Sequence, residues 1–262
     1  MVLILFELER EKIVVPEDKP YITISGSKAS DTIITWNQGR DLLQSPVVSI
    51  FASDFVGRFL TIENTFGTSG IAVALRVSAD RAAFYGCRII SFQDTLLDDS
   101  GRHYFNNCYI EGATDFICGN AASLYERCHL HSTSDRGGAM TAQHRNTAEE
   151  NTGFVFLGGK ITGSGSMFLG RPWGDFSKVV FGYTYMSNVV EPEGWNDWGD
   201  PTKQSATGQT LERRTTARKR RYEALWCMAS RRRVPRMAGL QTRQRDNDDR
   251  QRSRCVEARV TT

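Results

Sequence analysis

Hydrophobic and polar residues alternate in short stretches along most of the chain, and glycine or asparagine interrupts these stretches at close intervals. Three stretches share one form, in which an aromatic residue precedes a cysteine and an apolar residue follows that cysteine by two positions. They are Tyr85-Gly-Cys87-Arg-Ile89, Phe105-Asn-Asn-Cys108-Tyr-Ile110 and Tyr125-Glu-Arg-Cys128-His-Leu130, with looser copies at residues 59–64 and 156–161. A period of two with frequent turn residues predicts β-strands rather than helices.

The three cysteines recur at nearly equal steps, of 21 residues from Cys87 to Cys108 and 20 residues from Cys108 to Cys128. Self-similarity at this period, with strand-like units, is typical of a solenoid in which each repeat forms one coil. We therefore predict an all-β fold, a parallel β-helix. A β-sandwich with coincidentally even spacing is the less favoured alternative.

In a parallel β-helix, equivalent residues on successive coils stack about 4.8 Å apart. The cysteines would then form an internal stack, either as thiols or with one disulfide, and we favour buried thiols. The six cysteines include no CxxC pair, which makes a zinc or thioredoxin-type site a weak interpretation.

Two aspartates keep the register of the cysteines. Asp94 follows Cys87 by seven residues, and Asp115 follows Cys108 by seven. If the cysteines stack, the two carboxyl groups lie roughly 5 Å apart on neighbouring coils. Two carboxylates at that distance do not both ionise freely, so one holds its proton near neutrality. The spacing alone predicts an acid beside a nucleophile or base.

Other acidic residues in the same region carry a weaker signal. Asp98 and Asp99 in FQDTLLDD lack an acidic partner one coil later, and we interpret them as a solvated loop. Asp135 also follows its cysteine by seven residues, but it lies in the polar, glycine-rich stretch HSTSDRGG. We expect an outward loop there.

The four histidines give little indication of a site. His129 and His131 fall on one face of a predicted strand, which suits a metal, but no third ligand is evident. Ordinary packing or surface exposure is the favoured interpretation for both. His103 and His144 carry no signal.

Charge divides the 262 residues into two parts. Residues 203–262 contain 17 basic and 6 acidic residues, whereas residues 1–202 contain 16 basic and 24 acidic ones. We expect a folded domain over 1–202 and a disordered basic segment over 203–262. Such a segment is suited to nucleic acid or acidic polysaccharide, but its abrupt start favours a shifted reading frame or misjoined exon. The opening MVLILF is too short for a signal peptide, and no stretch is long enough to span a membrane.

Several separate motifs resemble the plant pectinesterase family over roughly residues 9–202. They are EKIVVPEDKPYITISG (11–26), AVALRV (72–77), FQDTL (92–96), GATDFICGNA (112–121), TAQ (141–143), LGRPWG (169–174) and EGWNDWGDP (193–201). The resemblance implies a right-handed parallel β-helix that removes methyl esters from homogalacturonan, without metal or cofactor. It also implies a chain truncated at the N-terminus and divergent after about residue 202, with the β-helix incomplete at both ends.

The resemblance assigns roles to individual residues. Asp115 is the implied nucleophile, Asp94 the implied general acid and then base, and Gln93 the implied donor to the oxyanion. Arg171 is implied to hold Asp115 ionised and oriented. The implied substrate contacts are Trp173, Phe116 and Ile71.

Two positions depart from the family pattern. Ile71 stands where the family commonly has a second glutamine, and its side chain offers no hydrogen bond to an oxyanion. Cys118 stands where the family often has phenylalanine, a milder change. We still expect weak to moderate esterase activity, because the Asp–Asp–Gln–Arg set is intact.

Two other functions stay open. Carboxyls about 5 Å apart also suit a β-helix glycoside hydrolase acting on polygalacturonate, although Gln93 and Arg171 favour an oxyanion. The second open function is a pectin-binding protein without turnover. The resemblance further implies a secreted, cell-wall location, a monomer, a methyl-esterified homogalacturonan substrate and a proteinaceous inhibitor as partner. No nucleic acid or membrane partner is expected for the 1–202 body.

Overall fold

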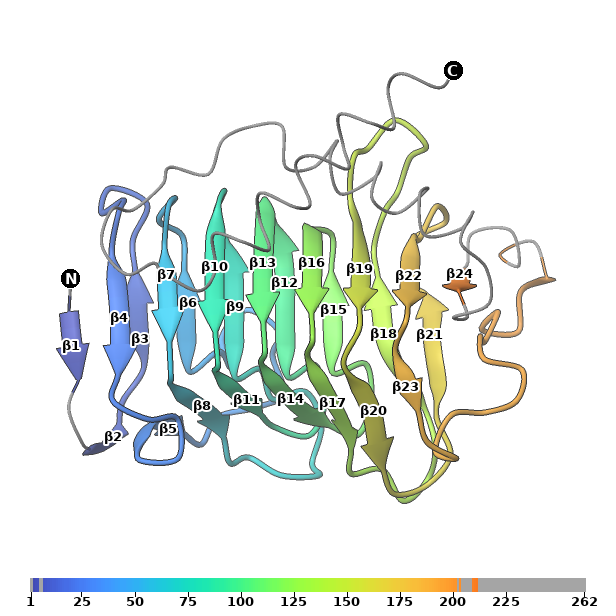
Figure 1. Ribbon diagram of the computed structural model, residues 1–262, viewed down its shortest axis with the longest axis horizontal. Helices are drawn as coiled ribbons and strands as arrows, with labels where there is room; N and C mark the ends of the chain where they lie inside the picture. Colours follow the sequence, from blue (N-terminus) through green and yellow to red (C-terminus); the bar gives the residue numbers. More distant parts are fainter. Residues whose placement is uncertain (1, 5–6, 202, 204–208, 212–262) are drawn as a thin grey trace, which may run out of the picture. The chain divides into compact units, whose positions relative to one another are not determined.

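The computed structural model describes residues 2–4, 7–201, 203 and 209–211, and the strands in this part of the chain form three parallel sheets, A, B and C (Figure 1). Sheet A contains β1 (Val2–Ile4), β4 (Thr23–Gly26), β7 (Val56–Arg58), β10 (Ala82–Tyr85), β13 (Arg102–Asn106), β16 (Ala122–Glu126), β19 (Gly153–Leu157), β22 (Val179–Gly182) and β24 (Gln209–Leu211). Sheet B contains β2 (Glu7–Arg10), β5 (Thr32–Trp36), β8 (Thr61–Asn64), β11 (Arg88–Ile90), β14 (Tyr109–Gly112), β17 (His129–Ser132), β20 (Lys160–Gly163) and β23 (Tyr185–Met186). Sheet C contains β3 (Ile13–Val15), β6 (Val48–Ile50), β9 (Leu75–Ser78), β12 (Leu96–Ser100), β15 (Ile117–Gly119), β18 (Ala139–Gln143) and β21 (Phe168–Pro172).

Neighbouring strands in each sheet are three apart in chain order, except β22 and β24, because each coil adds one strand to A, then one to B, then one to C. This arrangement is a right-handed parallel β-helix, so the predicted fold class is confirmed (Figure 1). The predicted boundary at residue 202 precedes one more strand, β24, which pairs in parallel with β22. Apart from residues 203 and 209–211, the basic segment predicted for 203–262 lies outside the described residues.

A single residue with positive φ turns the chain at the corner between sheets A and B. Six successive coils use it, with φ between 51° and 67°, at Phe59, Gly86, Asn107, Arg127, Gly158 and Tyr183. Glycine and asparagine enter this left-handed region at low cost, whereas the larger side chains do so only where the surrounding structure imposes it. The same turn on these six coils preserves the register from one coil to the next.

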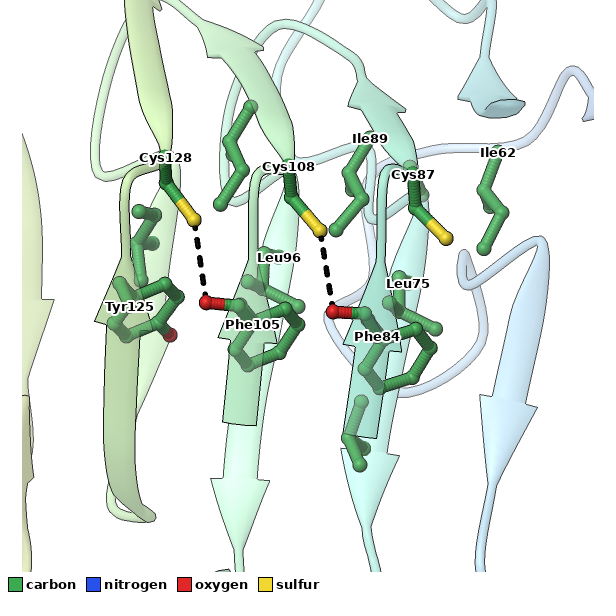
Figure 2. Close-up of a cluster of buried hydrophobic side chains, with 14 of the residues drawn as sticks. Ile62, Leu75, Phe84, Cys87, Ile89, Leu96, Phe105, Cys108, Tyr125 and Cys128 are labelled. Atoms are coloured by element: carbon green, nitrogen blue, oxygen red, sulfur yellow. Dashed lines mark hydrogen bonds between the residues drawn. The ribbon is translucent and has the colours of Figure 1, made fainter. Parts of the chain in front are cut away.

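The interior is built from rows of like side chains. Cys87, Cys108 and Cys128 lie one above another, and the thiols of Cys108 and Cys128 donate to the carbonyl oxygens of Phe84 and Phe105, at 3.6 and 3.5 Å (Figure 2). The cysteines at 87, 108, 118 and 128 are free and buried, which confirms the preference for thiols. Burial raises the pKa of Cys108, so its thiol is neutral.

An aromatic row runs beside the cysteines. Successive rings stack with centroids 4.4 to 5.1 Å apart, in the order Phe84, Phe105, Tyr125, Phe156 and Phe181. Each such pair stabilises the fold by about 0.5–1.5 kcal/mol beyond its area burial. Tyr85, the aromatic residue of the first cysteine repeat, lies outside this row. The ring in register is that of its neighbour Phe84, and Tyr85 pairs with Asn106.

The acidic pair at 98–99 lies in strand β12 and not in a solvated loop, so that prediction is wrong. Asp98 is fully buried, with Oδ1 2.5 Å from His103 Nδ1, and Oδ2 accepts a hydrogen bond from the Tyr125 hydroxyl at 2.6 Å. The other ring nitrogen of His103 lies 2.6 Å from the Ala79 carbonyl oxygen. A buried carboxylate is tolerated only with such partners, and they lie on other strands.

Opposite charges explain the remaining features of this network. Burial lowers the pKa of His103, but the Asp98 carboxylate and the Ala79 carbonyl outweigh burial and raise it overall. Asp99 bonds Arg76 at 2.9 Å and the Ser78 hydroxyl at 2.7 Å. His103, which carried no signal in the sequence, is thus part of a buried ion pair.

Candidate active site

The corner between sheets B and C brings the predicted carboxylates together. Asp94 lies between β11 and β12, and Asp115 lies between β14 and β15. The backbone amide of Asp94 donates to the Thr114 carbonyl at 3.2 Å, and a parallel β-bridge pairs Gln93 with Thr114. The residues that follow this pair, Asp94 and Asp115, therefore occupy equivalent positions on neighbouring coils. The register predicted from the cysteine spacing is confirmed.

Both aspartates adopt a left-handed backbone, with φ of 57° at Asp94 and 47° at Asp115. Aspartate tolerates this region better than most residues, but the conformation is sparsely populated and is typical of functional corners. Both residues are buried, at 8% and 4% exposure. The corner therefore holds two carboxyls side by side with little access to water.

Arg171 of β21 forms a forked ion pair with Asp115. Its Nε lies 2.8 and 3.0 Å from the two carboxylate oxygens, and its Nη2 lies 2.7 Å from Oδ2. A planar guanidinium that bonds both oxygens fixes the carboxylate in one orientation. The predicted contact between Arg171 and Asp115 is present.

Asp94 has a different environment from Asp115. Burial, followed by the charge of Asp115, raises its pKa to about 7, although the Arg171 cation acts in the opposite direction. A carboxyl with a pKa near neutrality both donates and accepts protons efficiently. The pair thus contains one oriented carboxylate and one proton-exchanging group, the division expected for an acid–base pair.

Gln93 and Ile71 lie side by side next to the aspartates. An isolated parallel β-bridge pairs the backbones of the two residues on neighbouring coils, and both residues are half-buried. Among the described residues the Gln93 side-chain amide has no hydrogen-bond partner, which leaves its N–H groups available to a ligand. Ile71 packs against the apolar cluster of Val73, Leu97, Cys118 and Ala142, and so gives the site an apolar wall where the family pattern has an amide.

Aromatic residues border this corner. Trp173 packs on the same apolar cluster, and its ring stacks on His144 with centroids 4.3 Å apart. Trp198 lies over the guanidinium of Arg171, 3.7 Å from ring centroid to Cζ, and is 53% exposed. A cation between a carboxylate and an indole face is held from both sides.

Not every predicted site residue lies at the corner. Phe116 is fully buried in the interior core, where a ligand on the outer face does not reach it, so its predicted substrate contact is wrong. Asp115 turns the chain with its left-handed backbone, and the next two side chains, Phe116 and Ile117, both enter the interior core. Cys118 is also buried, beneath Ile71 and Trp173.

The remaining sequence candidates behave as ordinary polar residues. Asp135 is exposed, as expected for a loop residue. His129 Nε2 and His131 Nδ1 both bond the Thr162 hydroxyl, at 2.7 and 2.8 Å, which confirms packing as their role. In the described part of the chain no three His, Cys, Asp or Glu side chains are grouped to hold a metal ion, and no helix is long and apolar enough to cross a membrane.

Sequence reasoning missed three residues near the site. Trp198 lies within EGWNDWGDP, a motif that supports the family resemblance but assigns no role to this residue. His144 directly follows TAQ, and Gln143 within that motif is fully buried. Gln143 accepts from the amides of Arg145 and Lys178, at 3.1 and 2.9 Å, and thereby ties the chain that follows β18 to the chain that precedes β22.

Comparison with known proteins gives consistent matches. A family model described as Pectinesterase matches residues 3–211. Putative pectinesterase 11 from Arabidopsis thaliana is 68% identical over 196 residues, which cover 75% of this chain and 56% of that protein. Pectinesterase QRT1 from the same plant is 43% identical over 220 residues, covering 78% of this chain and 58% of that protein.

A solved structure, the pectin methylesterase from carrot, superposes with a TM-score of 0.76 at 28% sequence identity. The match covers 91% of this chain and 88% of the carrot chain. The chain spans a little more than half the length of the two curated relatives.

Proposed function

The chain belongs to the pectinesterase family, and from that premise we propose that it hydrolyses the methyl esters of homogalacturonan at the corner of sheets B and C. The observation that carries the proposal is the asymmetric carboxyl pair. Asp115 is bonded by Arg171 through both oxygens, while the pKa of Asp94 is raised to about 7. An ester hydrolase without a metal needs such a nucleophile and such an acid.

In the first half of the reaction, an oxygen of Asp115 attacks the ester carbonyl carbon at C6 of a galacturonate unit. The carbonyl oxygen becomes an oxyanion, which accepts a hydrogen bond from the Gln93 amide. The C6–methoxy bond then breaks, and Asp94 donates its proton to the departing oxygen, giving methanol and an acyl-enzyme. A pKa near 7 leaves Asp94 protonated for this step in mildly acidic surroundings.

In the second half, Asp94 is a carboxylate and accepts a proton from water. The resulting hydroxide attacks the acyl carbon, the bond to Asp115 breaks, and the free galacturonate carboxyl leaves. Asp94 ends protonated and Asp115 ionised, as at the start. The Arg171 fork supports this cycle because it offsets the charge that returns to Asp115.

Methanol release measured beside reducing-end release on methyl-esterified pectin tests the proposal. We expect methanol without new reducing ends, and a loss of at least about 1000-fold in the Asp115→Asn variant. Reducing ends without methanol would instead support the glycoside hydrolase. Release that survives Asp115→Asn would contradict the assignment of the nucleophile.

A second candidate function is a pectin-binding protein without turnover, which Ile71 favours. The position next to Gln93 presents an apolar side chain, so the oxyanion receives one side-chain donor fewer than the family pattern provides. Loss of one such donor typically costs 100- to 1000-fold in kcat. Pectin binding with no methanol release, even after Ile71→Gln, would establish this alternative.

We propose the cell wall as the place of action, after secretion, because homogalacturonan is a wall polymer and the chain is similar to plant pectinesterases. A monomer and a proteinaceous inhibitor as partner are proposed on the same resemblance. Pull-down of the inhibitor protein and the mass in solution test these two proposals separately.

A further inference from the structure

His144 and Trp173 occupy equivalent positions on neighbouring coils of sheet C. The residues immediately before them, Gln143 and Pro172, are paired in register between β18 and β21. The two rings are nearly parallel, with centroids 4.3 Å apart and an interplanar angle of 21°. The two rings follow the C-terminal ends of these strands, whereas the carboxyl pair precedes the N-terminal ends of β12 and β15. The imidazole extends the flat surface of the indole, which packs on the same apolar cluster of sheet C as Ile71.

The backbone around His144 is fixed on both sides. Its own amide donates to the Gly119 carbonyl at 2.8 Å. Gln143, directly before it, is fully buried and donates to Asn120 at 3.1 Å, while its Oε1 accepts from the amide of Arg145, directly after it. A ring on such a fixed backbone, stacked on a neighbour, binds a ligand at little cost in conformational entropy.

The edge of the His144 ring lacks a protein partner. Within the described residues neither ring nitrogen makes a hydrogen bond, and neither is a buried unpaired atom, so the edge faces solvent. The other three histidines differ, because His103, His129 and His131 each have a ring nitrogen bonded to the protein. An imidazole always carries at least one N–H donor, and here it is available to a ligand.

We propose that His144 is a substrate-binding residue, and that its ring N–H donates a hydrogen bond to an oxygen of the galacturonate unit bound beside Trp173. This inference rests on the proposed function, because the ligand is the same pectin chain. His144 takes no part in bond making or breaking. It acts on how tightly the sugar acid is held, and on which unit of the chain is presented to Asp115.

Substitution of His144 by phenylalanine tests this role, because Phe keeps a flat stacking ring and removes both nitrogens. A neutral hydrogen bond contributes about 0.5–1.5 kcal/mol, or about 2- to 10-fold in affinity. We expect KM for pectin to rise by about that factor, with kcat within about twofold of wild type. The Kd for fully de-esterified oligogalacturonate, measured by calorimetry, should rise in parallel.

Two further variants make the test specific. His144→Gln keeps an N–H donor without the ring, and it should bind oligogalacturonate more tightly than His144→Phe. The matched control is His131→Phe, the same change at a half-buried histidine of sheet B whose ring stacks on Tyr109 with centroids 6.0 Å apart. It should leave KM and Kd unchanged.

Each outcome distinguishes the inference from the proposed function. Unchanged KM and Kd in His144→Phe would overturn the inference, as would a fall in kcat with KM constant. A wild-type protein that binds oligogalacturonate but releases no methanol would overturn the proposed function alone, and Kd would still decide the role of His144. A wild-type protein that binds no oligogalacturonate would overturn both.

Discussion

Replacing Asp115 by asparagine removes one of the two neighbouring charges and keeps the size and planar shape of the side chain. We expect the pKa of Asp94 to fall as a result. Burial is the first cause of its raised value of about 7, and the charge of Asp115 is the second. The substitution removes only the second cause, so the pKa should stay above that of an ordinary aspartate.

The size of the effect follows from the register. Equivalent positions on neighbouring coils are about 4.8 Å apart, so the carboxyls lie roughly 5 Å apart. Two unit charges at that distance, in an effective dielectric of about 20, repel by about 3 kcal/mol. That energy corresponds to about 2 pKa units. The Arg171 fork already offsets part of the repulsion, so we expect the pKa of Asp94 to fall by about 1 to 2.

Carboxyl carbon chemical shifts, followed from pH 3 to 9 in protein labelled at aspartate, measure this pKa directly. An Asp94→Asn variant assigns the signal. The control is Asp135→Asn, which removes an exposed carboxylate at the same seven-residue spacing from its cysteine and should leave the pKa of Asp94 unchanged. An ordinary pKa near 4 in the wild type, or a value unmoved by Asp115→Asn, would refute the coupling.

Three further substitutions test the site and its scaffold. Ile71→Gln adds an amide beside Gln93 and should raise kcat for methanol release by about 10- to 100-fold; an unchanged kcat would mean that Ile71 does not limit the rate. Asp98→Asn breaks the buried pair with His103 and should cost about 3–5 kcal/mol in urea denaturation at pH 6. Because the folded-state pKa of His103 is raised, this stability is full below about pH 6.5 and is lost as pH rises through the folded value, so the cost should shrink by pH 9. Phe105→Ala interrupts the aromatic row and should cost about 3–5 kcal/mol, whereas a cost under about 1 kcal/mol would mean that the row adds little stability.

The sequence predicted those parts of the structure that repeat. The cysteine steps indicated the coil length, and the same seven-residue offset from Cys87 and Cys108 indicated that Asp94 and Asp115 are neighbours. Both inferences hold because a parallel β-helix converts equal spacing along the chain into contact between coils. A repeat such as that of the cysteines can be read from one sequence, without knowing which residues are in contact in the fold.

The features that the sequence left hidden depend on partners that follow no period. Asp98 resembles a solvated acid until His103 and Tyr125 are seen beside it, five and 27 residues away. The face on which a side chain points is equally hidden in strands buried on both sides. Phe116 follows the nucleophile candidate directly and still belongs to the core.

The β-helix separates the stability of the wall from the chemistry on its surface. Inward positions form the cysteine and aromatic rows, and outward positions at the corner of sheets B and C carry Gln93, Asp94 and Asp115. A change at one outward position therefore alters the site without disturbing the rows, and Ile71 is such a change. It leaves the carboxyl pair and the Arg171 fork in place. For this reason the rate of the ester reaction, rather than the formation of the site, is the property that Ile71 should control.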